Sequence, residues 1–163
     1  MLRLTLIRHA KTSPAHDGQE DWDRELEAKG KHEAQMMSER VKDQDLIPDL
    51  IITSPAVRAR STTKIFAEHL KVRKNHIVED ERLYLASPDV MLTVLKELSG
   101  THHHVFMVGH NPGITEFADR LSKERSVDNM PTSAVFTLEF HVKNWADVEW
   151  RSGVNAEFDY PRR

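Results

Sequence analysis

Short β-favouring runs alternate along this chain with longer helical patterns, and the alternation constrains the fold more than any other feature. Such an order implies crossover connections and a mostly parallel sheet with helices on both of its faces. We therefore expect an α/β fold, a three-layer α/β/α sandwich around a mostly parallel central sheet. The predicted strands are Leu2–Ile7, Asp49–Thr53, His103–Val108 and Ser133–Phe140, with weaker candidates at His76–Glu79 and Val148–Arg151. The predicted helices are Glu27–Asp43, Ala56–Leu70, Ser87–Leu98 and Ile114–Leu121.

Two of these elements carry specific local signals. Ser133–Phe140 alternates with period two, which places apolar side chains on one face of a strand. Ser87 followed by Pro88 is typical of a helix start, with the serine as N-cap and the proline at the first helical position. Gly30 is a weak point near the start of its helix.

Length and composition narrow the class of protein. The chain has 163 residues, which predicts one domain over residues 1–163. Its net charge of −3 gives no support for nucleic-acid or membrane-surface binding. With no cysteine, thiolate catalysis and cysteine-based zinc sites are excluded. Apolar runs are far shorter than the roughly 18 residues that span a bilayer, and the N-terminus has no signal-peptide core, so we expect a cytoplasmic protein.

Basic and imidazole side chains follow three of the predicted strands. Arg8 and His9 come directly after the first strand, Arg58 lies at the start of the helix after the second, and His110 follows the third long run. Ligands of such folds bind beyond the carboxyl ends of the strands. We therefore expect these four side chains to share one crevice.

This combination suits a phosphoryl group. Arginine provides planar pairs of donors for phosphoryl oxygens, and the N-termini of helices favour anions. Any one of these residues alone is more often a surface or loop residue than a ligand. Their joint occurrence at three separate strand ends favours a phosphate site.

Three segments resemble the signatures of the histidine phosphatase superfamily. They are Arg8-His9-Ala10-Lys11-Thr12, Ser54-Pro55-Ala56-Val57-Arg58-Ala59-Arg60-Ser61-Thr62 and Val108-Gly109-His110-Asn111-Pro112. Asp21-Trp22-Asp23-Arg24-Glu25-Leu26, followed by Gly30, is similar to a segment of the branch that contains the phosphohistidine phosphatase SixA.

The resemblance implies a covalent mechanism. His9 is then the nucleophile and carries a phosphohistidine intermediate, while Arg8, Arg58 and His110 bind the phosphoryl oxygens, His110 as a cation. Thr12 and Asn111 are candidate substrate-binding residues. The arginines provide the positive charge, so neither a metal nor another cofactor is required.

One departure from the family pattern bears on the substrate. Many members place a glutamate acid where this chain reads Leu83-Tyr84-Leu85, with Leu85 at the position of the acid. Glu81 remains a substrate-binding candidate that reaches into the site, and Asp80 a weaker one, but the more common role of such a run, Glu79-Asp80-Glu81, is a solvated acidic turn. An imidazole leaves with far less help from an acid than an alkoxide does, so this loss favours phosphohistidine in a partner protein, with inorganic phosphate as the product.

Two other functions stay open at this point. One is a broad phosphomonoesterase that acts on small sugar or nucleotide phosphates. The other is a phosphate-binding or phosphoprotein-binding module without turnover. The run His102-His103-His104 invites a metal site, but neighbouring strand residues point to opposite faces, so we expect the start of a strand there and no metal.

Overall fold

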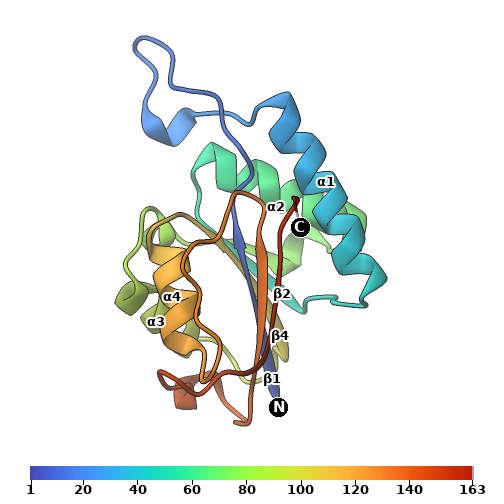
Figure 1. Cartoon of the computed structure of the whole chain (residues 1–163), viewed down its shortest axis with the longest axis vertical. Coiled ribbons are helices and arrows are strands. Elements are labelled where there is room, and N and C mark those ends of the chain that lie inside the picture. Colours follow the sequence, from blue (N-terminus) through green and yellow to red (C-terminus); the bar gives the residue numbers. More distant parts are fainter. Residues whose placement is uncertain (163) are drawn as a thin grey trace.

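The computed structural model describes residues 1–162 and is built on a six-stranded sheet with the strand order β3-β2-β4-β1-β5-β6 (Figure 1). The first four strands of that order pair in parallel, whereas β5 is antiparallel to β1 and β6 is antiparallel to β5. The predicted mostly parallel sheet is confirmed. The strands are β1 (Leu2–Arg8), β2 (Leu50–Thr53), β3 (Ile77–Glu79), β4 (His104–Gly109), β5 (Val135–Phe140) and β6 (Val154–Asp159).

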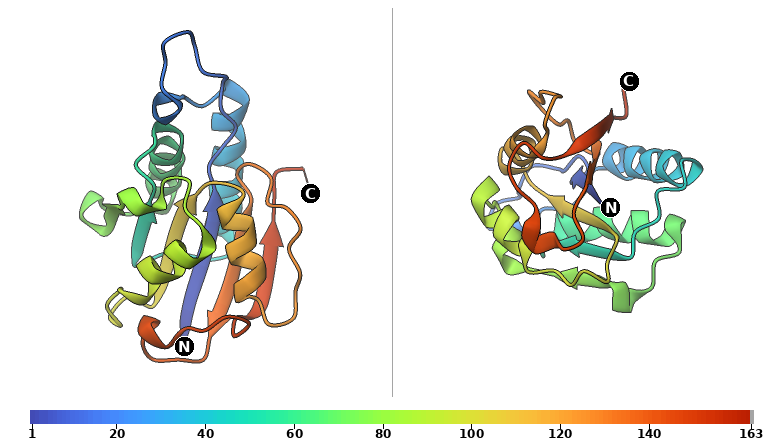
Figure 2. Two further views of the ribbon diagram at one scale, coloured as in Figure 1. Left: turned by 90° about the vertical axis from the view of Figure 1, so that its left-hand side faces the viewer. Right: turned by 90° about the horizontal axis from the view of Figure 1, so that it is seen from below.

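Helices cover both faces of the sheet, as expected for the three-layer sandwich (Figure 2). Side chains alternate along β1, so Leu4 and Leu6 join the core under α3 and α4, whereas Ile7 joins the core under α1 and α2. The helices are α1 (Ala28–Asp43), α2 (Val57–Leu70), α3 (Pro88–Lys96) and α4 (Gly113–Leu121). Four 3-10 turns are η1 (Asp21–Asp23), η2 (Lys74–His76), η3 (Glu81–Leu83) and η4 (Trp145–Asp147).

The local signals of the sequence are largely confirmed. Ser87 caps α3, because its hydroxyl accepts a hydrogen bond from the Val90 N–H at 3.3 Å. The alternating apolar residues of β5, including Phe136 and Leu138, are fully buried.

The prediction of an edge strand at Val148–Arg151 is wrong. Arg151 adopts a left-handed backbone with φ of 59°, which turns the chain instead of extending it. The edge strand is β6, where Phe158 packs against Phe136 of the neighbouring strand with ring centroids 5.9 Å apart. Within residues 1–162, no helix is both long and apolar enough to cross a bilayer.

Candidate active site

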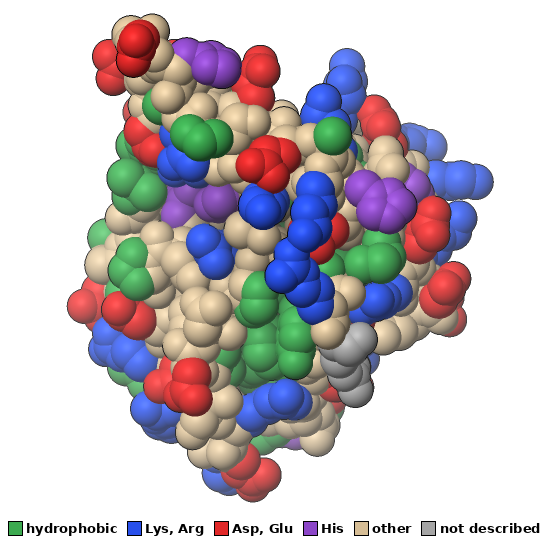
Figure 3. Space-filling view, turned by 45° about the horizontal axis from the view of Figure 1, so that its top comes forward, with side chains coloured by type: hydrophobic (Ala, Val, Ile, Leu, Met, Phe, Trp, Pro, Cys, Tyr) green, Lys and Arg blue, Asp and Glu red, His purple; other side chains and the backbone are tan. Residues whose placement is uncertain are grey.

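The carboxyl ends of β1, β2 and β4 open into a pocket of about 360 Å³. Figure 3 shows histidine side chains in a hollow beside the projecting segment between β1 and α1, with basic side chains around it. The pocket brings together all four residues that the strand ends predict, together with Thr12 and Asn111. Its lining comprises Arg8, His9, Lys11, Thr12, Asp21, Arg24, Arg58, Leu85, His110, Asn111 and Thr132.

His9 is held in one tautomer. Its Nδ1 lies 2.8 Å from the carbonyl oxygen of Ala10, and because a carbonyl only accepts, Nδ1 carries the proton and Nε2 keeps its lone pair. Burial, with smaller contributions from the nearby His110 and Arg58, lowers the pKa of His9 to about 3. The ring is therefore neutral at neutral pH, as a nucleophile must be.

His110 lies beside this ring, with the two ring centroids 5.2 Å apart. Its Nε2 is 2.7 Å from the hydroxyl oxygen of Ser54, whereas its Nδ1 is buried and has no hydrogen-bond partner within the described residues. Burial lowers the pKa of His110 to about 4, and Arg58 contributes to the shift. Burial next to positive charge thus favours the neutral ring in the free pocket, whereas the expected cation concerns His110 bound to a phosphoryl group.

The two arginines are fixed by backbone carbonyls and still keep donors for a ligand. Arg8 donates from Nη1 to the Met130 carbonyl at 3.0 Å, and its buried Nε has no partner within residues 1–162. Arg58 is 3% exposed and donates from Nη1 to the Asp21 carbonyl at 2.8 Å. A guanidinium has five N–H donors, so both retain capacity for phosphoryl oxygens.

A carboxylate also lines the pocket, and sequence reasoning did not select it. Asp21 Oδ2 accepts hydrogen bonds from Arg58 at 3.0 Å and from the Tyr84 hydroxyl at 2.5 Å, while Oδ1 accepts one from Arg24 at 3.1 Å. These donors, with Tyr84 contributing most, lower the pKa of Asp21 to about 2. The segment Asp21-Trp22-Asp23-Arg24, singled out above only for its family resemblance, is the signal that could have found this cluster.

The two candidate substrate-binding residues differ in what they can offer. Arg24 donates to Thr12 Oγ1 at 2.6 Å, which leaves the Thr12 hydroxyl proton for an acceptor in the pocket. Asn111 donates from Nδ2 to Asn129 and to the Met130 carbonyl, and its Oδ1 accepts from Thr115. Asn111 therefore fixes the pocket wall more than it binds a ligand through its side chain.

Comparison with known proteins shows which family has this fold and these pocket residues. Residues 4–84 match the model of the histidine phosphatase superfamily (branch 1). The whole fold is similar to a protein of Agrobacterium tumefaciens assigned as the phosphohistidine phosphatase SixA, with 27% identity, a TM-score of 0.81, and coverage of 96% of this chain and 97% of that one. The chain belongs to the histidine phosphatase superfamily.

Two further relatives extend the comparison. The protein histidine phosphatase SixA complexed with tungstate shares the fold, with 19% identity, a TM-score of 0.78, and coverage of 98% of this chain and 95% of that one. An uncharacterised protein of Mycobacterium tuberculosis is 29% identical over 165 residues, which cover 96% of this chain and all of the relative. The protein is accordingly a phosphatase of the histidine phosphatase superfamily.

Leu85 is the residue that the family resemblance places at the position of the glutamate acid. Leu85 lines the pocket and is 56% exposed, with φ of 49°. Glu81, in contrast, is exposed and is not among the residues that line the pocket, which is the placement that a solvated acidic turn predicts. The cause is turn η3, which buries Leu83 in the core and leaves Glu81 at the surface before the chain reaches the pocket.

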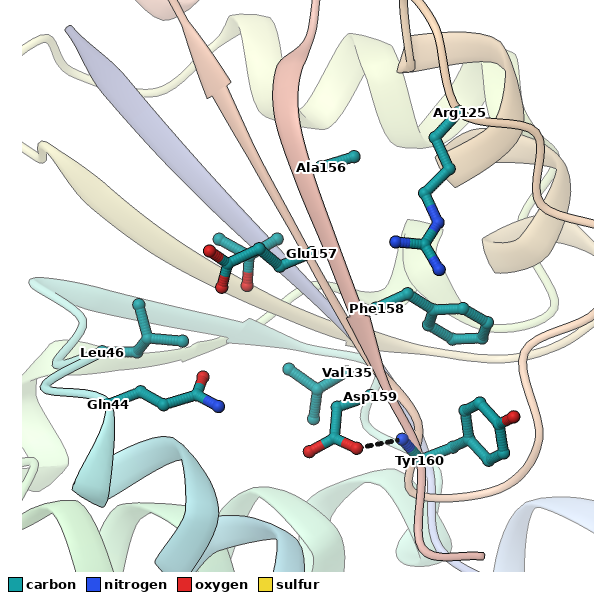
Figure 4. Close-up of a pocket in the computed structure, with 10 residues that line it drawn as sticks. Gln44, Leu46, Arg125, Val135, Ala156, Glu157, Phe158, Asp159 and Tyr160 are labelled. Carbon is teal, nitrogen blue, oxygen red and sulfur yellow. Dashed lines mark hydrogen bonds between the residues drawn. The ribbon is translucent and has the colours of Figure 1, made fainter. Parts of the chain in front are cut away.

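A second hollow of about 340 Å³ lies beside β6, away from the residues of the histidine phosphatase pocket (Figure 4). Glu157 and Asp159 line it on one side of the strand, and Phe158 and Arg125 lie on the other. Asp159 is paired with Arg40 at 3.1 Å. None of the residues in the three family segments lines this hollow.

Proposed function

We propose that this histidine phosphatase removes the phosphoryl group from phosphohistidine in a partner protein through a covalent intermediate on His9. The observation that carries the proposal is the absence of a protonated acid from the pocket lining. Among the described residues that line the pocket, the one carboxyl group is Asp21, which three hydrogen-bond donors keep ionised, and Leu85 stands where the family resemblance places the acid. An alkoxide leaving group needs a proton from such an acid, whereas imidazole does not.

The geometry supports a two-step reaction. The Nε2 lone pair of His9 attacks phosphorus while Nδ1–H stays on the Ala10 carbonyl, and the substrate P–N bond breaks with its electron pair going to the leaving imidazole. Arg8 and Arg58 would stabilise the charge on the phosphoryl oxygens. Water then attacks phosphorus, the electron pair returns to His9 Nε2, and inorganic phosphate leaves with the oxygen and the protons of that water.

His110 completes the oxygen-binding set. Its buried Nδ1 faces no protein acceptor or donor within the described residues, and Ser54 can accept from or donate to Nε2. A bound phosphoryl dianion favours the protonated ring, because opposite charge raises the pKa of a histidine. We therefore assign His110 as a donor to a phosphoryl oxygen once substrate is bound.

A protein-borne phosphate fits the mouth of the pocket. Leu85 is 56% exposed and the Lys11 side chain 45% exposed at the rim, whereas His9 is 8% exposed at the floor. The similarity to SixA proteins at 27% identity supports the same class of substrate.

The test is rapid-quench labelling with a ³²P-phosphohistidine protein and, separately, with a phosphate monoester. We expect wild type to trap acid-labile, base-stable label, His9→Ala to trap none, and the exposed control His32→Ala to match wild type. A faster reaction of the monoester would favour the broad phosphomonoesterase. Neither label nor phosphate release from either donor would overturn the enzymatic proposal in favour of a binding module.

A further inference from the structure

Asp21 lines the pocket on its exposed side, near the open mouth. In-line attack by His9 places the leaving group opposite the nucleophile, which means toward the open mouth. The Asp21 side chain is 44% exposed, whereas that of Arg58 beside it is 4% exposed, so the carboxylate belongs to the mouth and the guanidinium to the floor. Any group that departs from phosphorus therefore passes close to Asp21.

This carboxylate is held rigidly and remains charged. Arg24, Arg58 and Tyr84 donate to it from three directions, which fixes its position and occupies three of its roughly four acceptor sites. Because the Tyr84 hydroxyl donates its hydrogen bond to Asp21 and guanidinium groups do not lose their protons in proteins, the cluster is not a source of protons for an ester oxygen. It can accept one more hydrogen bond.

A phosphorylated imidazole differs from a phosphate ester in the feature that such an acceptor can use. When the second ring nitrogen of a phosphohistidine carries a proton, the P–N bond breaks to give neutral imidazole rather than an imidazole anion. The proton needed for departure is then already on the leaving group. An ionised carboxylate next to that N–H favours the protonated ring. The oxygen that leaves from a phosphate ester has no second ring nitrogen beside it, so the leaving group cannot carry a proton in this way.

We propose that Asp21 is the residue that selects N-phosphorylated imidazole, by accepting a hydrogen bond from the second ring nitrogen of the leaving group. This role of Asp21 rests on the function proposed above, the cleavage of phosphohistidine. The site then treats both imidazoles of the reaction alike, since Nδ1–H of His9 is held by the Ala10 carbonyl and the N–H of the substrate ring by Asp21. The proton stays on the substrate ring throughout, and the electron pair of the P–N bond goes to the nitrogen that carried phosphorus.

The same carboxylate selects against small anionic substrates. Nucleotide phosphates and other substrates with a second anionic group bring negative charge to the mouth, where the ionised Asp21 repels it. Asp21 would thus attract the N–H of a leaving imidazole and repel substrates with further anionic groups.

The experiment compares phosphoimidazole with p-nitrophenyl phosphate, whose leaving groups have comparable basicity but of which only imidazole carries an N–H. For Asp21→Asn we expect kcat/KM on phosphoimidazole to fall by at least about tenfold, while kcat/KM on p-nitrophenyl phosphate stays within about threefold. The alkaline limb of the pH profile on phosphoimidazole is expected to move to lower pH, because the substrate ring then loses its proton more easily. Asp23→Asn removes the same charge from the same turn outside the pocket and serves as the control.

The outcomes separate the possible failures. Equal losses on both substrates, with weaker inhibition by tungstate, would show that Asp21 only positions Arg58 and would overturn the proposal, as would no loss on either substrate. A wild type that turns over the ester and not phosphoimidazole would overturn the proposed function itself. Asp21→Ser provides a second variant without the charge, and it is expected to shift the ratio of the two substrates in the same direction as Asp21→Asn.

Discussion

The backbone N–H of Ala10 donates a 2.8 Å hydrogen bond to the hydroxyl of Thr62, and this contact ties the loop after His9 to helix α2. The same hydroxyl donates to the carbonyl of Arg58 at 2.8 Å. One fully buried side chain thus sets the position of the proposed nucleophile relative to the arginine that faces it. Its use of both donor and acceptor explains why a hydroxyl is needed here.

Thr62→Val is expected to reduce both stability and activity. Valine keeps the shape of threonine but leaves the buried N–H of Ala10 without an acceptor, which costs about 1–3 kcal/mol. Urea unfolding measures the stability, and kcat on phosphoimidazole measures the misplacement of His9. Thr62→Ser retains the hydroxyl and is expected to keep most of the activity. Full stability of Thr62→Val would contradict this reading of the contact.

Gly30→Ala is expected to disturb the pocket although Gly30 does not line it. A Cβ at this position would lie 2.2 Å from the carbonyl oxygen of Lys11, a backbone atom that cannot turn aside. Alanine favours a helix over glycine by about 1 kcal/mol. Overpacking against backbone costs about 1–3 kcal/mol, so the net effect is destabilising.

The measurement for Gly30→Ala is the unfolding midpoint together with the affinity for tungstate, since a shift of Lys11 moves the loop that carries His9. Lys31→Ala, an exposed substitution in the same turn, is the control and is expected to be neutral. If Gly30→Ala is destabilised but binds tungstate as wild type does, the contact between Gly30 and the Lys11 backbone affects stability and not the pocket.

Residues that follow strands directly were predictable from the sequence, and residues that reach the pocket from loops were not. The strand pattern fixed where Arg8, His9 and His110 must lie, because the ends of neighbouring parallel strands meet at one edge. Asp21 and Tyr84 are distant in sequence, and their 2.5 Å contact depends on how two loops fold over that edge. Periodicity carries no signal for such a contact.

The charge of His110 illustrates a second limit of sequence reasoning. A family role as a phosphate ligand suggests a cation, but burial beside Arg58 lowers the pKa of the ring. Desolvation depends on packing, which residue type alone does not give. The placement of Glu81 outside the pocket has a related cause, since turn η3 decides which of its residues face the core.

Stability is expected to fall between pH 6.5 and about 4. Burial lowers the pKa of His9 to about 3 and the pKa values of His104 and His110 to about 4. A histidine that stays neutral when folded but takes up a proton when unfolded stabilises the fold above its unfolded pKa of 6.5. That stability is lost as pH falls, by about 2 kcal/mol for each such residue at pH 5.

Urea unfolding from pH 8 to pH 5 tests this expectation. His104 lies within the sheet, where its Nε2 is 2.8 Å from the Thr5 hydroxyl, far from the pocket lining. His104→Asn is therefore expected to flatten the pH dependence with or without phosphate. Added phosphate is expected to reduce only the share of the pH dependence that comes from His9 and His110, because a bound anion favours their protonated forms. A pH-independent free energy of unfolding in wild type would contradict the assignment.

Leu85→Glu is expected to introduce the acid that this pocket does not have. The position lines the pocket at its mouth, and its backbone already has φ of 49°, so a glutamate adds no new strain. The ionised Asp21 nearby raises the pKa of a second carboxyl group, which keeps it protonated closer to neutral pH. We expect a gain of at least about tenfold in kcat on phenyl phosphate, a substrate with a poor leaving group.

The gain should depend on the leaving group. A nitrophenolate departs without a proton, so Leu85→Glu is expected to leave p-nitrophenyl phosphate turnover nearly unchanged, and Leu85→Gln, which cannot donate an acidic proton, should match wild type on both esters. An equal rise on both substrates would point to better binding instead of acid catalysis. A selective rise on phenyl phosphate would show that the substitution of one residue at the mouth separates ester hydrolysis from the cleavage of phosphohistidine on an otherwise shared phosphate site.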